Sequence, residues 1–154
     1  MSSQVQVLNL QPLHAGGHGD LFIGQLSSNG VRVVVKYLRE FHMPHERNAF
    51  VREVGILSRG IDGIVRLFGS NTQTERPYYV MEYLPGGPLS QYAGRLGANQ
   101  LLAVATELAH RLASFHATVG SHGDFKPDNI LLSQNGQLKI ADPLGNGFGF
   151  TSLL

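Results

Sequence analysis

The stretch His122-Gly123-Asp124-Phe125-Lys126-Pro127-Asp128-Asn129 decides the interpretation of this chain of 154 residues. It gathers two carboxylates, a lysine and an amide side chain in one short run, and the apolar residues 130–132 follow directly. A polar turn between two elements would use the same residue types, because Asp, Pro and Asn are common in turns. A plain turn, however, does not require Lys126 and Asn129 at these offsets from Asp124. The run is therefore a candidate functional site, and the segments before and after it in the sequence indicate the fold that carries it.

A helix is predicted before this run and a hairpin after it. Residues 130–132 and 138–140 are apolar, and the Asn135-Gly136 pair between them is a strong hairpin signal. Residues 99–117 repeat apolar side chains near the helical period, which predicts the longest helix of the chain. The repeated positions are Leu101, Ala105, Leu108, Leu112 and Phe115.

The first half of the chain predicts strands and one helix. Strands are expected at residues 4–10, 21–23, 31–36, 64–68 and 78–84. Residues 69–77 suit a hairpin connection, and the Pro-Gly breaker at residues 85–88 closes this half. A helix should begin near Pro44 and end at Gly60, because Phe50, Val54 and Leu57 form one apolar stripe.

Composition restricts the class of protein. Apolar residues make up 42% of the chain and charged residues 15%, which is typical of a globular protein. The absence of cysteine excludes a disulfide framework and fits a reducing compartment. A formal net charge of +1 gives no electrostatic case for a nucleic-acid partner, and polar residues interrupt the longest apolar stretch, residues 101–115. We therefore expect a cytoplasmic protein that binds neither nucleic acid nor membrane.

The quoted run resembles the catalytic loop of protein kinases, whose pattern is H-R-D-L-K-P-x-N followed by an apolar strand. Phosphoryl transfer needs a carboxylate that accepts a hydroxyl proton, a cation for the phosphoryl charge and an oxygen ligand for magnesium. The resemblance assigns these roles to Asp124, Lys126 and Asn129, and it makes His122 a packing residue.

Asp142 stands where the kinase family carries the magnesium ligand of its D-F-G motif. Pro143 replaces the aromatic residue of that motif and Leu144 replaces the glycine. A hard cation needs the carboxylate oxygen and not its neighbours, so the resemblance still implies a metal role for Asp142. Proline fixes φ, which puts in doubt the switching that the family attributes to the aromatic residue.

The upstream motifs resemble the nucleotide-binding parts of the same family. Residues 13–21 resemble the glycine-rich loop, L-G-x-G-x-x-G-x-V, whose backbone N–H groups approach phosphate, although a flexible turn would also use glycines. Lys36 ends a run similar to V-A-I-K and should contact the α- and β-phosphates, and residues 79–87 resemble the hinge that binds adenine, with Met81 as gatekeeper. The implied nucleotide-binding residues are Leu13, Gly16, Gly17, Gly19, Leu21, Val34, Lys36, Met81, Glu82, Leu84 and Leu131.

The family pairs this lysine with a glutamate on a helix, and the chain offers two candidates. Glu53 lies on the side of the helix bounded by Phe50 and Leu57, whereas Glu46 lies in the first turn, where an acidic residue interacts favourably with the helix dipole. We expect Glu53 to orient Lys36, and we count both among the catalytic residues. His42 and His45 lack a set of carboxylates or cysteines with ligand spacing, so a zinc site is not expected.

The motifs run in kinase order from Leu8 to Gly145, so the resemblance implies an α+β, protein-kinase-like fold. Residues 1–84 would form the N-lobe, an antiparallel sheet with one helix, and residues 85–154 would follow the hinge as a short, mainly helical part of the C-lobe. The implied function is transfer of the ATP γ-phosphate, with Mg²⁺, to a Ser or Thr hydroxyl of a protein. Two alternatives stay open: a nucleotide-binding pseudokinase or regulatory module, and a small-molecule kinase similar to aminoglycoside phosphotransferases, whose motif begins H-G-D.

The printed chain stops at Leu154, where the family continues with an activation segment and further helices. We therefore expect part of the apolar face of the helix at residues 99–117 to lack cover. Such a patch invites self-association or a second chain. Gly123 in place of arginine also argues against activation through a phosphorylated activation loop.

Overall fold

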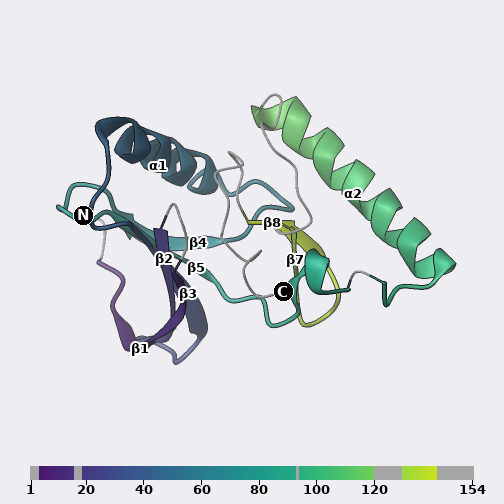
Figure 1. The fold of residues 1–154 in the computed structure, drawn as a ribbon, viewed down its shortest axis with the longest axis horizontal. Coiled ribbons are helices and arrows are strands. Elements are labelled where there is room, and N and C mark those ends of the chain that lie inside the picture. Colours follow the sequence, from purple (N-terminus) through teal and green to yellow (C-terminus); the bar gives the residue numbers. More distant parts are fainter. Residues whose placement is uncertain (1–3, 16–18, 93, 120–129, 142–154) are drawn as a thin grey trace.

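The computed structural model describes residues 4–15, 19–92, 94–119 and 130–141, which form two antiparallel sheets and two α-helices (Figure 1). The larger sheet has the order β1-β2-β3-β5-β4, and the smaller sheet has the order β6-β7-β8. The strands are β1 (Val7–Ala15), β2 (Gly19–Leu26), β3 (Arg32–Leu38), β4 (Leu67–Asn71), β5 (Tyr78–Glu82), β6 (Gly87–Pro88), β7 (Ile130–Leu132) and β8 (Leu138–Ile140). The helices are α1 (Pro44–Leu57) and α2 (Ala98–Val119), with a short 3₁₀ turn at Leu89–Tyr92. The predicted α+β, protein-kinase-like fold is confirmed.

Alternation along the central strands gives the larger sheet two buried faces. On β3, Val33 and Val35 point to one face, where Val80 of β5 joins them in a hydrophobic cluster. Val34 points to the opposite face, where it belongs to a second cluster with Phe50 of α1 and Tyr79 of β5. The sheet therefore has a core on both sides, and α1 contributes to only one of them.

Local chemistry defines both ends of α1. Pro44 occupies the first turn, and the Met43 backbone N–H donates a hydrogen bond to Glu46 Oε2 at 2.6 Å. Beyond the helix Gly60 adopts a φ of 65°, a conformation that glycine enters without strain. The buried residues Phe50, Glu53 and Leu57 form a single stripe. Glu53 thus points to the same side as the apolar residues that pack on the sheet.

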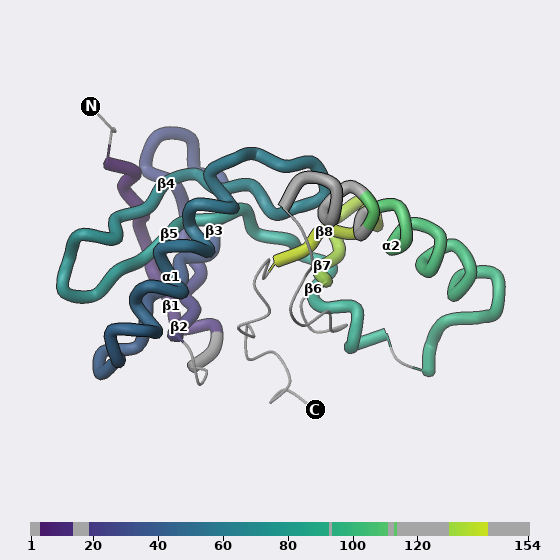
Figure 2. Tube along the Cα trace, turned by 90° about the horizontal axis from the view of Figure 1, so that it is seen from above, coloured from purple at the N-terminus to yellow at the C-terminus, as the bar shows by residue number. Residues whose placement is uncertain are grey.

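The smaller sheet lies between the larger sheet and α2, as the ribbon of Figure 1 and the tube of Figure 2 show. Its strand β8 is joined to the segment before β4 by two backbone hydrogen bonds, from Val65 N–H to the Ile140 carbonyl at 3.0 Å and from Ile140 N–H to the Gly63 carbonyl at 2.8 Å. On the other side the Leu138 N–H donates to Glu107 Oε1 of α2 at 3.1 Å. β8 therefore connects all three parts of the molecule.

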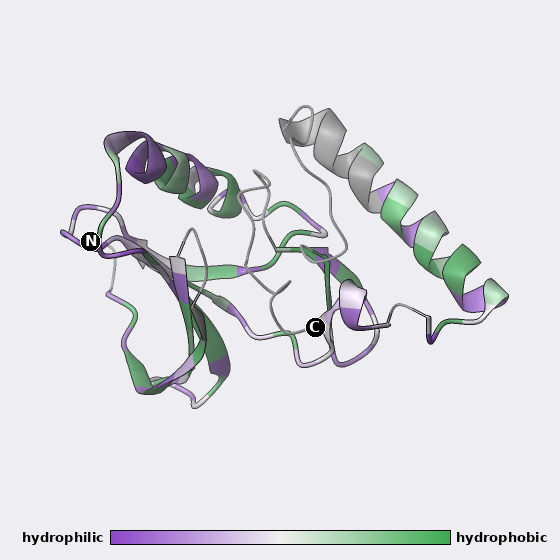
Figure 3. Cartoon of the chain, in the orientation of Figure 1, coloured by the Kyte–Doolittle hydropathy of each residue, from purple (hydrophilic) through white to green (hydrophobic). Residues whose placement is uncertain are grey.

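Much of α2 is exposed in the part of the chain that the structure describes. Figure 3 shows hydrophobic residues along this helix, and two of them, Leu101 and Leu102, are 54% and 67% exposed. Within the described residues, no helix is long and apolar enough to span a membrane.

The strand bounds differ from the prediction in several places, and β2 covers Gly19–Leu26 where residues 21–23 were expected. β1 begins at Val7 and runs to Ala15 instead of covering residues 4–10, because a register shift near Asn9, whose φ is 57°, lets the strand continue its pairing with β2. β4 begins at Leu67, since Ile64 instead forms a parallel bridge with Ile140. Gly87 and Pro88, expected as a breaker, pair with β7 and complete the smaller sheet.

Candidate functional site

A buried ion pair joins β3 to α1. Lys36 Nζ lies 3.3 Å from each of the two carboxylate oxygens of Glu53, and the two residues are 2% and 1% exposed. Lys36 is in β3, two residues before its end, where it is the cross-strand neighbour of Tyr79. The structure therefore brings together the lysine and the glutamate that the sequence pairs, while their catalytic role stays a prediction.

Aromatic residues enclose this ion pair. Tyr79, which is 0% exposed, donates a hydrogen bond from its hydroxyl to Glu53 Oε1 at 2.8 Å. The rings of Phe50 and Tyr79 pack with centroids 5.4 Å apart, and Lys36 Nζ lies 5.9 and 5.7 Å from those two centroids. Ring faces attract a cation at such distances. The ammonium group is thus held by a carboxylate and by the electron-rich faces of two rings.

Glu46, the rival glutamate, is used elsewhere. Its carboxylate forms an ion pair with Arg39 and accepts the Met43 N–H at the start of α1. The hydrogen bond from Arg39, followed by that from the Met43 backbone, holds the pKa of the Glu46 carboxyl below its ordinary value of 4.5. Glu46 therefore stabilises the beginning of the helix and does not contact Lys36.

A pocket of about 200 Å³ lies where β5 passes into the following segment. Six of its lining residues were predicted to bind nucleotide: Leu13, Val34, Met81, Glu82, Leu84 and Leu131. The others were not predicted, and they are Tyr83, Pro85, Gly87, Pro88 and Gln91. These additional residues come from the segment after β5, whose path depends on the pairing of β6 with β7. The pocket combines apolar side chains from both sheets with an irregular backbone segment, which suits a flat, largely apolar ring with polar edges.

Two of the predicted nucleotide-binding residues have structural roles of their own. Leu21 is 2% exposed in the core cluster that contains Val34, and it is not among the lining residues of this pocket. At Gly19, a Cβ would lie 2.5 Å from the Tyr37 carbonyl oxygen, so close packing of β2 on β3 requires glycine there. The β2–β3 packing is therefore one reason for glycine at position 19, while its contact with phosphate stays a prediction.

The Glu82 side chain ties the strand beside the pocket to β8. Its Oε1 accepts hydrogen bonds from Lys139 Nζ at 2.6 Å and from the Arg66 backbone N–H at 2.8 Å. The Glu82 backbone N–H also donates to the Arg66 carbonyl at 2.9 Å, so the group of Glu82 that we expect to meet a ligand is its backbone carbonyl. No feature of the sequence predicted the pairing of Glu82 with Lys139.

The predicted residues Gly16, Gly17, Asp124, Lys126, Asn129 and Asp142 lie outside the described residues. The hairpin between two of them is described. Asn129 directly precedes β7 in the sequence, and Asp142 follows β8 after one residue. Ile130 and Ile140, the residues of these two strands farthest from the hairpin turn, are paired.

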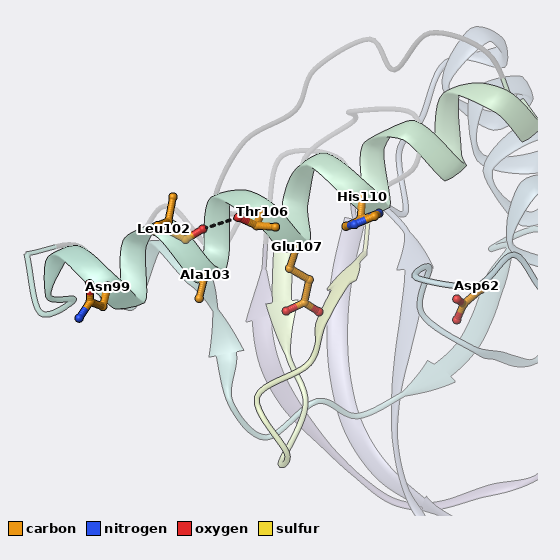
Figure 4. A pocket seen from close by; sticks show the side chains of 7 residues that line it. All are labelled: Asp62, Asn99, Leu102, Ala103, Thr106, Glu107 and His110. Carbon is orange, nitrogen blue, oxygen red and sulfur yellow. Dashed lines mark hydrogen bonds between the residues drawn. The ribbon is translucent and has the colours of Figure 1, made fainter.

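A larger hollow, with a volume of about 820 Å³, lies between one face of α2 and the loop that carries Asp62 (Figure 4). Figure 4 shows Glu107 and His110 on the side of α2 that turns toward Asp62. Among the residues that the structure describes, none that the sequence predicts for nucleotide or catalysis lines this hollow. The smaller pocket beside β5, whose lining residue Val34 lies two residues before Lys36 on the same strand, is therefore the candidate site.

Comparison with known proteins agrees with this arrangement. The family model described as protein tyrosine and serine/threonine kinase matches residues 7–147. The chain is 34% identical over 142 residues to serine/threonine-protein kinase Pkn1 of Myxococcus xanthus, which covers 88% of this chain and 20% of that protein. It is 36% identical over 134 residues to integrin-linked protein kinase 1 of Arabidopsis thaliana, with 81% and 27% covered, and 31% identical over 138 residues to Aurora kinase C of Mus musculus, with 86% and 50% covered.

The chain belongs to the protein tyrosine and serine/threonine kinase family. It spans between a fifth and a half of the length of these three relatives.

Proposed function

We propose that the chain binds Mg-ATP and transfers the γ-phosphate to a Ser or Thr hydroxyl of a protein. The observation that carries the proposal is the buried pair of Lys36 and Glu53, in which Lys36 lies two residues along β3 from Val34, a lining residue of the pocket of β5. A buried ion pair adds little net stability compared with apolar residues of the same volume, so a functional reason for its presence is needed. Kinase chemistry supplies that reason, because Lys36 can meet phosphate oxygens while Glu53 holds its orientation.

The pocket supports binding of the adenine ring. Val34 and Leu131 offer apolar contacts from the two sheets, Met81 limits the depth of the pocket, and the backbone at Glu82 and Leu84 offers hydrogen-bonding groups to the edge of the base. Side-chain identity matters little for such backbone contacts. The serine/threonine specificity rests on Lys126 and on the similarity to relatives such as serine/threonine-protein kinase Pkn1.

In the proposed reaction, the acceptor hydroxyl oxygen forms a bond to the γ-phosphorus. The bond from that phosphorus to the oxygen bridging the β- and γ-phosphates breaks, ADP leaves, and the hydroxyl proton passes to Asp124. Lys126 offsets charge on the transferred group. Asn129 and Asp142 carry amide and carboxylate oxygens of the kind that Mg²⁺ prefers, and this ion would neutralise charge on the phosphate oxygens. Gly16, Gly17 and Gly19 would bring backbone N–H groups to the phosphates.

The test is binding and turnover measured on the same preparation. Mg-ATP at 100 times its dissociation constant should stabilise the chain by about 2.7 kcal/mol in thermal unfolding. Transfer of labelled γ-phosphate to a protein acceptor then separates a kinase from a module that only binds nucleotide. An unchanged melting temperature with millimolar Mg-ATP would refute the proposal.

Self-association, or association with a second chain, is proposed for the surface of α2. Leu101 and Leu102 are the exposed apolar side chains that carry it. Light scattering should detect an assembly that Leu102→Glu dissociates. A monodisperse monomer that is identical for both proteins would contradict this part of the proposal.

A further inference from the structure

The hydroxyl of Tyr79 belongs to the buried site. Tyr79 is the first residue of the hinge-like run, residues 79–87, but that motif assigns no role to its side chain. Its oxygen lies 2.8 Å from Glu53 Oε1, closer than the 3.3 Å that separates Lys36 Nζ from the same atom. A hydrogen bond to an ionised carboxylate is shorter and roughly twice as strong as one between neutral groups. The geometry therefore gives Glu53 an anchor on the sheet besides the lysine.

The position of Tyr79 is fixed from two directions. It is the cross-strand partner of Lys36 in the β3–β5 ladder, so both side chains leave the same face of the sheet side by side. Its ring packs on Phe50, which lies one helical turn before Glu53 on the same side of α1. Tyr79 thus contacts the ion pair at both ends, with its hydroxyl on the carboxylate and its ring face near the ammonium group.

We propose that Tyr79 is a positioning residue that keeps α1 and Glu53 on the sheet while Lys36 shares its charge with a nucleotide phosphate. This inference rests on the proposed function, because it takes Lys36 as the lysine that meets phosphate. A phosphate competes with Glu53 for the single ammonium group. The tyrosine hydroxyl does not take part in that competition, so its bond to Glu53 persists when nucleotide binds. α1 and Glu53 then already have the position that the bound nucleotide requires, which lowers the free-energy cost of ordering them on binding.

Tyr79→Phe tests the proposal, because it removes one oxygen and keeps the ring that packs on Phe50. Tyr78→Phe is the matched control: it is the next residue of β5, it points to the opposite face, and its ring packs on Tyr37. We expect Tyr79→Phe to weaken Mg-ATP binding about tenfold, the factor that corresponds to one hydrogen bond to a charged group, and Tyr78→Phe to change it less than about twofold. A purely structural role would lower the melting temperature and leave the affinity of the folded protein unchanged, and this result would overturn the proposal.

A double-mutant cycle with Glu53→Gln locates the effect. The glutamine keeps the shape of the side chain and removes the charge that strengthens the bond. In that background Tyr79→Phe should change both nucleotide affinity and the unfolding equilibrium clearly less than in the wild-type chain. Equal effects in the two backgrounds would mean that the hydroxyl does not act through Glu53. If the wild-type chain binds no ATP, the proposed function fails, and the unfolding cycle alone then decides whether Tyr79 anchors Glu53.

Discussion

Removal of the Glu53 carboxylate should cost more stability than removal of the whole ion pair. At 3.3 Å and an effective dielectric of about 20, the attraction between the two charges is about 5 kcal/mol before the cost of burying them. Glu53→Gln takes away the carboxylate that lies 3.3 Å from the buried Lys36 ammonium. Loss of one partner of a buried pair typically costs about 3–5 kcal/mol, a large share of a domain stability of about 5–15 kcal/mol.

The double variant Glu53→Gln/Lys36→Met provides the comparison. Methionine fills much of the volume of the lysine and carries no charge, so the double variant should be more stable than Glu53→Gln by at least about 1 kcal/mol. Glu75→Gln, at an exposed position, serves as the control and should change the free energy of unfolding by no more than about 0.5 kcal/mol.

Urea unfolding followed by far-UV circular dichroism measures these differences, provided that the slope with denaturant stays the same among the variants. The reasoning would be refuted if Glu53→Gln cost less than about 1 kcal/mol, or if the double variant cost the sum of the two single changes. Either result would mean that water reaches the pair in solution and that α1 does not close over Lys36.

Three further predictions address other parts of the molecule. Asp124→Asn should lower phosphoryl transfer by about 10²- to 10⁴-fold while Mg-ATP affinity stays within about twofold, because a general base contacts the acceptor hydroxyl; an unchanged transfer rate would remove Asp124 from this role. Gly86→Ala should destabilise the fold by about 1–3 kcal/mol, because its Cβ would lie 2.6 Å from the Leu132 carbonyl oxygen. Gly55→Ala should instead stabilise α1 by about 0.5–1 kcal/mol, because a Cβ there would meet no atom within 4 Å. The denaturant midpoints of the two variants test this difference. Arg39 lowers the pKa of the Glu46 carboxyl from 4.5, so the ion pair should stabilise the folded chain above pH 4.5 and lose this effect as the pH falls through the lowered pKa. The melting temperatures of the wild type and of Glu46→Gln should therefore differ most near neutral pH and converge in acid. A difference that stays constant with pH would contradict the pairing.

The sequence by itself determined the features that depend on short spacings. The stripe of Phe50, Glu53 and Leu57 is a property of one helix, and it correctly separated Glu53 from Glu46 as the neighbour of Lys36. The Asn-Gly turn between β7 and β8 is likewise local, as is the proline at the start of α1. Motif order along the chain then sufficed for the family and the fold class.

Only the tertiary structure decided what depends on pairing between distant segments. The strand β6 exists because Gly87 and Pro88 meet β7, and Ile64 leaves the expected strand because β8 offers it a partner. The two contacts that extend the candidate site, Tyr79 with Glu53 and Lys139 with Glu82, join residues 26 and 57 positions apart. A strand places its side chains by which neighbour it pairs with and in which register, and neither property is encoded in the spacing of its own residues. From the sequence alone, Tyr79 cannot be told from an ordinary core residue. Its contact with Glu53 follows only from the pairing of β5 with β3 and from the packing of α1 on that sheet.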